Sequence, residues 1–208
     1  MKISIHLDEY RQLARERLGD ARYRHTLAVA RLGRELAEHY GISGDQAEAA
    51  GLLHDITKEV PKADQLQILK NSDIMMDKVF QASTNVYHSA TAFLFVRDKL
   101  GIDDMDILNA IRYHTTGREG MSLLEKIIYT ADAVSYDRDC PDAERLRKLA
   151  FADLDECMLE IIEFTLKKLT EDRYLIAEDT VFCYNSILLA RLGKKENGTG
   201  SIPEAQHG

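Results

Sequence analysis

The sequence has little of what would place it outside the ordinary globular proteins. Its three cysteines, at positions 140, 157 and 183, lack Cys-x-x-Cys spacing, which argues against a disulfide framework and favours a reducing compartment. No apolar run approaches the ~20 residues that a membrane-spanning helix needs, and the N-terminus lacks the apolar core of a signal peptide. We therefore expect a cytoplasmic protein that has no membrane partner.

Basic charge is also scarce. Lysine and arginine number 27 against 35 acidic residues, so the formal net charge is -8. A general nucleic-acid binder needs a basic surface for phosphates, and this composition disfavours one. A small anionic substrate is not excluded, because a bound metal can reverse the local field of an acidic protein.

Strand signals are nearly absent, and with only three prolines helical periodicity runs through the chain. The sequence predicts an all-α fold with helices near residues 6–17, 20–40, 44–58, 62–71, 84–100, 103–115, 122–135, 142–171 and 177–192. The length fits one domain, 1–193, at ~150 residues per domain. Residues 194–208 have no apolar face and are predicted to form a disordered tail. Residues 71–82 could form a lid or a dimer surface, and the sequence does not choose.

Several predicted helices place a histidine or an aspartate on their apolar face. Each one alone is more often a hydrogen-bonded core residue. Together they would bury several charges at a cost of several kcal/mol each, unless a cation lies among them. Six ligands exceed the four that a tetrahedral zinc ion binds, so the set is better explained by two ions that share one bridging carboxylate. The nitrogen and oxygen donors favour iron, manganese, cobalt or zinc, and they are His25, His54, Asp55, His88, His114 and Asp132.

The order and spacing of these residues resemble the HD-domain metal-dependent phosphohydrolases. The resemblance is closest to the YqeK-type symmetrical bis(5'-nucleosyl)-tetraphosphatases, and it covers roughly residues 8–192. It rests on the segments "RYRHTLAVARLGRELAEHYG", "AAGLLHDITKE", "YHSATA", "IRYHTTG" and "KIIYTADAVS". It implies an HD-domain helical bundle with additional C-terminal helices.

The resemblance also implies a di-iron centre that splits diadenosine tetraphosphate into two ADP through a metal-activated hydroxide. His25, His54 and Asp132 would hold one iron, His88 and His114 the other, and Asp55 would bridge them. Asp55, His54 and Lys58 are the expected catalytic residues. Substrate contacts are expected from Arg22, Lys58, His88, Thr115, Arg138, Asp179 and Thr180. The turn after Asp132 and the segment "AEDTVFCYN" depart from the family pattern.

Two alternatives stay open at this point. One is another HD-type nucleotide phosphohydrolase, a nucleotidase or a deoxynucleoside triphosphatase, often built on one ion. The other is a nucleotide-sensing module that binds without turnover. His88 and His114 favour two ions, and the complete ligand set speaks against a sensor. A homodimer is a further expectation that the sequence does not decide.

Overall fold

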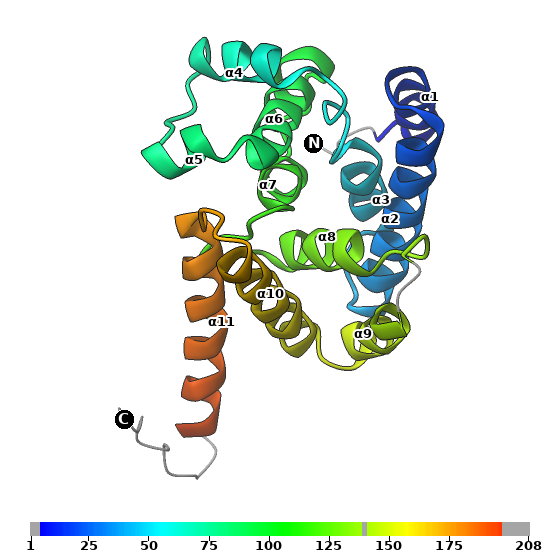
Figure 1. The fold of residues 1–208 in the computed structure, drawn as a ribbon. Coiled ribbons are helices and arrows are strands. Elements are labelled where there is room, and N and C mark those ends of the chain that lie inside the picture. The colour runs from blue at the N-terminus through cyan, green and yellow to red at the C-terminus, as the bar shows by residue number, and fades with distance from the viewer. Residues whose placement is uncertain (1–4, 139–140, 197–208) are drawn as a thin grey trace.

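The computed structural model describes residues 5–138 and 141–196, and within these ranges it contains helices and no strand (Figure 1). The all-α prediction is confirmed. The elements in chain order are α1 (Leu7–Arg17), α2 (Asp20–His39), α3 (Gly44–Leu53), α4 (Lys62–Lys70), α5 (Lys78–Ala82), the 3-10 helix η1 (Thr84–Val86), α6 (Tyr87–Leu100), α7 (Met105–Tyr113), α8 (Leu123–Val134), α9 (Pro141–Ala152), α10 (Leu154–Glu171) and α11 (Glu178–Glu196).

Helix α3 lies at the centre of the bundle and packs against α1, α2, α7 and α8. Eight of its ten residues are buried, because alanine, glycine and leucine occupy most of the helix. The contact with α2 is especially close, since a Cβ atom added at Gly51 would lie 2.6 Å from the Cα atom of Ala30. This packing fixes the end of α3, where His54 and Asp55 follow.

Helices α10 and α11 form the C-terminal addition to the bundle, and Figure 1 shows α11 extending away from the other helices. The prediction of one helix over 142–171 is wrong. Asp153 has an extended backbone and accepts a hydrogen bond from the Glu156 N–H at 2.9 Å. It is therefore the N-cap of a new helix, a position that aspartate favours.

Other element ends also differ from the prediction. Helix α3 stops at Leu53 rather than at residue 58, and turns follow through Glu59. Helix α5, within the segment 71–82, was not predicted. Helix α11 continues to Glu196, and residues 197–208 of the predicted tail lie outside the described residues. None of the described helices combines the length and the apolar character that crossing a bilayer requires.

Candidate metal centre

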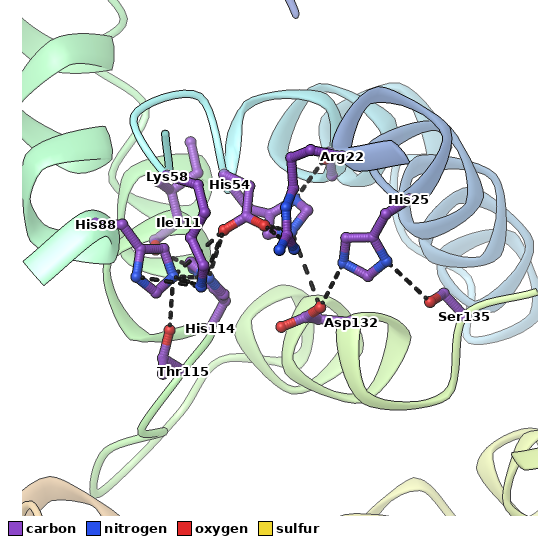
Figure 2. Close-up of polar contacts among 12 residues, drawn as sticks. Arg22, His25, His54, Lys58, His88, Ile111, His114, Thr115, Asp132 and Ser135 are labelled. Carbon is purple, nitrogen blue, oxygen red and sulfur yellow. Dashed lines mark hydrogen bonds and ion pairs between the residues drawn. The ribbon is translucent and has the colours of Figure 1, made fainter. Parts of the chain in front are cut away.

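The six residues predicted as metal ligands converge in the middle of the bundle (Figure 2). They come from the second turn of α2, the end of α3, the start of α6, the end of α7 and the last turn of α8. Their donor atoms form three overlapping groups, and within each group all atoms lie within 4.8 Å of one another. The groups are His25–His54–Asp55, His54–His114–Asp132 and Asp55–His88–His114.

Two of the histidines are oriented by the helix that each one ends. The Nδ1 atom of His54 lies 2.7 Å from the Gly51 carbonyl oxygen, and that of His114 lies 2.7 Å from the Ile111 oxygen. A carbonyl can only accept, so in both rings Nδ1 carries a proton, and Nε2 is the nitrogen that faces the cluster. Metal-binding histidines are commonly held in this way.

His25 is oriented by a residue that the sequence reasoning missed. Its Nδ1 atom lies 2.9 Å from Oδ2 of Asp137, and the Ser135 hydroxyl donates to Oδ1 of Asp137 at 2.6 Å. Its Nε2 atom lies 2.9 Å from Oδ1 of Asp132. Asp137 follows the end of α8, where helical periodicity gives no direction for a side chain. An acidic residue close after Asp132 in sequence was the available signal.

His88 and His114 face each other with Nε2 atoms 3.1 Å apart, and Oδ1 of Asp55 lies 3.3 Å from the His88 atom. The Nζ atom of Lys58 lies 2.9 Å from the same Nε2, and the Thr115 hydroxyl lies at 3.3 Å. Burial, together with the charges of His114 and Lys58, lowers the pKa of His88 well below its usual value. The ring is therefore neutral, which is the form that binds a metal.

The two carboxylates of the centre are ionised. Burial opposes the charge on Asp55, but the neighbouring His54 and His114 outweigh it and hold the pKa well below the usual value. The pKa of Asp132 is lowered too, because the hydrogen bond with His25 and the charge of His54 outweigh burial. Burial alone would lower the pKa of His54, but the charges of Asp55 and Asp132 outweigh it, and the pKa is raised. The space around the two carboxylates therefore attracts positive charge.

Two donor atoms of the cluster are buried without a hydrogen-bond partner among the described residues. They are Nε2 of His54 and Oδ1 of Asp55. A buried polar atom without a partner costs about 1–3 kcal/mol. A divalent cation would satisfy both atoms, and the imidazole and carboxylate donors are of the kind that such ions bind. The residues present therefore fit a divalent metal site.

Five of the predicted substrate contacts lie at this centre, and one of them, His88, is itself a predicted metal ligand. An Nη atom of Arg22 is 2.9 Å from Oδ2 of Asp55, and Arg138 lies 3.4 Å from Oδ1 of Asp132. Lys58 and Thr115 reach His88 as described above. Lys58 does so from a turn after α3 and not from a continuing helix.

The other two predicted contacts, Asp179 and Thr180, lie away from the metal donors at the start of α11. Thr180 lines a pocket of about 390 Å³ that Thr115 also lines. Asp179 lines a smaller cavity of about 80 Å³ together with Arg112. Burial raises the pKa of Asp179, although the nearby Arg112 opposes the shift. The two residues thus line different pockets, and neither makes a hydrogen bond or an ion pair with a metal donor.

The fold and the centre agree with comparison to known proteins. The HD domain family matches residues 22–137, which is more than half of the chain and contains all six donors. The helical bundle and its histidine–aspartate cluster are thus those of an HD-domain protein.

Relatives narrow the class further. The symmetrical bis(5'-nucleosyl)-tetraphosphatase of Bacillus subtilis (strain 168) is 36% identical over 82% of this chain and 91% of its own length. That of Halalkalibacterium halodurans is 35% identical over 86% of this chain and 95% of its own. A crystal structure of a predicted HD superfamily hydrolase involved in NAD metabolism from Clostridium acetobutylicum matches with a TM-score of 0.86 and 32% identity, over 89% of this chain and 98% of the other. The chain belongs to the HD-domain family of which the symmetrical bis(5'-nucleosyl)-tetraphosphatases are members.

Proposed function

We propose that the protein is a metal-dependent hydrolase that cleaves diadenosine tetraphosphate symmetrically into two ADP. Relatives with this activity in their names match most of the chain at 35–36% identity. The observation that carries the proposal is the convergence of six donors in overlapping groups, with Asp55 shared between two of them.

The proposed centre holds two metal ions, most favourably iron. His25, His54 and Asp132 would hold one ion, His88 and His114 would hold the other, and Asp55 would be the ligand common to both. Two of the donor groups, one with His25 and one with His88, share Asp55, and this supports the bridging role. When bound, such ions supply Lewis acidity and activate the nucleophile.

Three cationic side chains surround the donors and suit a polyphosphate. Arg22 and Arg138 contact the two carboxylates, and Lys58 lies beside His88. They supply local positive charge to a protein whose formal net charge is -8, and such a local field attracts an anionic substrate. In hydrolysis they neutralise the charge that develops on the leaving ADP, with Arg138 nearest to the exposed side. Thr115 offers a hydroxyl for a phosphate oxygen.

Product analysis tests the reaction. Protein loaded anaerobically with Fe²⁺, and in parallel with Mn²⁺, Co²⁺ or Zn²⁺, is incubated with diadenosine tetraphosphate, and the nucleotides are separated by chromatography. ADP as the sole product supports the proposal. AMP together with ATP contradicts symmetrical cleavage. Nucleotide binding without turnover would favour the sensing module, and turnover of mononucleotides alone would favour another HD phosphohydrolase.

The Asp55→Ala variant tests the centre. We expect loss of turnover and a lower metal content, because the shared ligand is gone, while the helical signal in far-ultraviolet circular dichroism persists. Asp103→Ala is the matched control, since Asp103 is exposed and its side chain makes no hydrogen bond or ion pair with the described residues. An Asp55→Ala protein with full activity would remove this residue from the mechanism.

Cellular location and assembly belong to the same proposal. Cys157 and Cys183 are buried thiols that form no disulfide in the described chain, which supports a cytoplasmic enzyme. A homodimer stays a prediction.

A further inference from the structure

The turn that follows α8 carries Asp137, the residue that orients the metal ligand His25. The turn runs from Ser135 to Arg138, and the Arg138 N–H closes it by donating to the Ser135 oxygen at 3.0 Å. Figure 2 shows Ser135 beside the His25 ring. Asp137 is the third residue of this turn, so the direction of its carboxylate depends on how firmly the turn itself is held.

Arg147, on α9, holds the first residue of the turn. Its Nη1 atom donates to the Ser135 oxygen at 3.0 Å and to the Val134 oxygen at 2.8 Å. Val134 is the last residue of α8 and Ser135 is its C-cap, and carbonyl groups at a helix end lack partners within the helix. A cation beside them is favourable for the helix dipole as well. The Ser135 oxygen thus accepts both the hydrogen bond that closes the turn and one that ties the turn to α9.

Tyr136, the second residue of the turn, ties it to α2 as well as to α9. Its ring centroid lies 4.7 Å from Cζ of Arg31 and 5.5 Å from Cζ of Arg147. Its hydroxyl donates to Glu35, one helical turn after Arg31 on α2. Both guanidinium groups lie within the distance at which a cation is attracted to an aromatic ring. The turn is therefore anchored to the two helices on which it rests.

Arg147 is not what attaches α9 to the bundle. Ala143 and Ala150 of this helix are buried, and the Tyr40 hydroxyl on α2 donates to the Ala150 oxygen at 2.6 Å. The hydrogen bonds of the Arg147 guanidinium group, and its contact with an aromatic ring, go to residues 134–136. Its contacts therefore serve the end of α8 and the turn beside the metal centre.

We propose that Arg147 and Tyr136 are positioning residues for the metal ligand His25, and that they act through the turn and the carboxylate of Asp137. The match to the HD domain family ends at residue 137, so α9 contributes to the geometry of a centre whose donors all lie before it. The inference rests on the proposed function only in that a divalent ion binds at His25. It does not require hydrolysis.

Competition between the protein and a chelator for Mn²⁺ tests the proposal without requiring turnover. Loss of a direct partner of a ligating histidine weakens metal binding about 10- to 100-fold, so Arg147→Met, one contact further away, should weaken it about 3- to 10-fold. Tyr136→Ala removes the second anchor and should weaken binding about 3-fold. Arg145→Met is the matched control on the same helix, because the hydrogen bonds of Arg145 go to Glu160. Its affinity for Mn²⁺ should equal that of the wild type.

The Asp137→Ala background separates positioning from a general loss of stability. When no carboxylate is left to position, adding Arg147→Met should weaken Mn²⁺ binding no further, because residues that act through one another are not additive. A purely structural role for Arg147 would instead lower the melting temperature in the presence of chelator and leave the affinity of the folded protein unchanged.

The proposal would be overturned if Arg147→Met and Tyr136→Ala both bind Mn²⁺ as tightly as Arg145→Met. Equal losses of affinity from Arg147→Met in the wild-type and Asp137→Ala backgrounds would overturn it too. If Arg147→Met does not fold, Tyr136→Ala decides, since the Tyr136 side chain is 43% exposed. The expected affinities in a protein that does not hydrolyse diadenosine tetraphosphate would support the positioning role and refute the proposed reaction. Turnover with unchanged affinities would refute the positioning role alone.

Discussion

Replacement of Gly51 by alanine should destabilise the protein through the contact between α2 and α3. The added Cβ would lie 2.6 Å from Cα and 2.9 Å from N of Ala30. Carbon atoms normally approach to ~3.5–4.0 Å, so the two helices must separate by about 1 Å. Overpacking costs about 1–3 kcal/mol, and the upper end applies here because the opposing atoms are backbone. The helix-propensity gain of about 0.5–1 kcal/mol offsets part of this cost, which leaves a net loss of about 2 kcal/mol.

The matched control is Gly33→Ala on α2, in the same helix pair. Its added Cβ would lie 3.2 Å from Cδ1 of Ile128, the end of a flexible side chain, so we expect nearly wild-type stability. Thermal unfolding in the presence of a chelator measures packing apart from metal binding. Gly51→Ala should melt about 4–8 °C below the wild type. A Gly51→Ala protein as stable as Gly33→Ala would refute the packing argument.

The same substitution should reach the metal centre. The Gly51 carbonyl oxygen accepts the hydrogen bond that orients His54, at 2.7 Å. A shift of α3 therefore moves a ligand, and Gly51→Ala should bind metal more weakly than Gly33→Ala when chelator competition is measured. Equal metal affinity would show that His54 keeps its position despite the displaced helix.

Two further predictions concern the metal directly. Asp137→Ala removes the partner of His25 Nδ1 and should weaken metal binding about 10- to 100-fold, whereas Asp103→Ala should leave it unchanged. Chelator competition measures the metal affinity of both variants. Equal affinities would contradict the role of Asp137 in orienting His25. Removal of metal by chelation should lower the melting temperature, because a ligand at 100 times its Kd stabilises by about 2.7 kcal/mol. Re-addition of Fe²⁺ or Mn²⁺ should restore it, and a melting temperature indifferent to metal would argue against the site.

The sequence predicted five of the donors because they lie on or at the ends of regular helices, where the 3.6-residue period gives each side chain a direction, whereas Asp55 was predicted from its place next to His54. The six predicted ligands are the residues that the structure brings together. Helical periodicity also predicted α9 and α10 as a single helix, because apolar residues continue with helical spacing on both sides of Asp153. Only the capping potential of that aspartate marked the break, and a single polar residue between apolar segments is a weak signal.

Residues in loops escaped prediction for a different reason. Asp137 and the pair Arg173–Tyr174 follow the ends of helices, and their positions depend on how the chain leaves each helix. A Schellman ending is predicted from glycine at the left-handed position, and Arg173, whose φ is 57°, stands there instead. A rule that reads helix ends from glycine therefore does not find this turn.

The metal donors and the α10–α11 junction lie in different parts of the chain. All six donors and Asp137 lie within residues 22–137, the range that matches the HD domain family. Arg173 and Tyr174 lie beyond it, at the junction of the two C-terminal helices. Substitutions at this junction leave the metal donors and the helices that carry them in place. Among the described residues, Thr115 both lies within hydrogen-bond distance of a metal donor and lines the pocket of about 390 Å³ that the start of α11 borders, so the C-terminal helices meet the hydrolytic centre at this side chain.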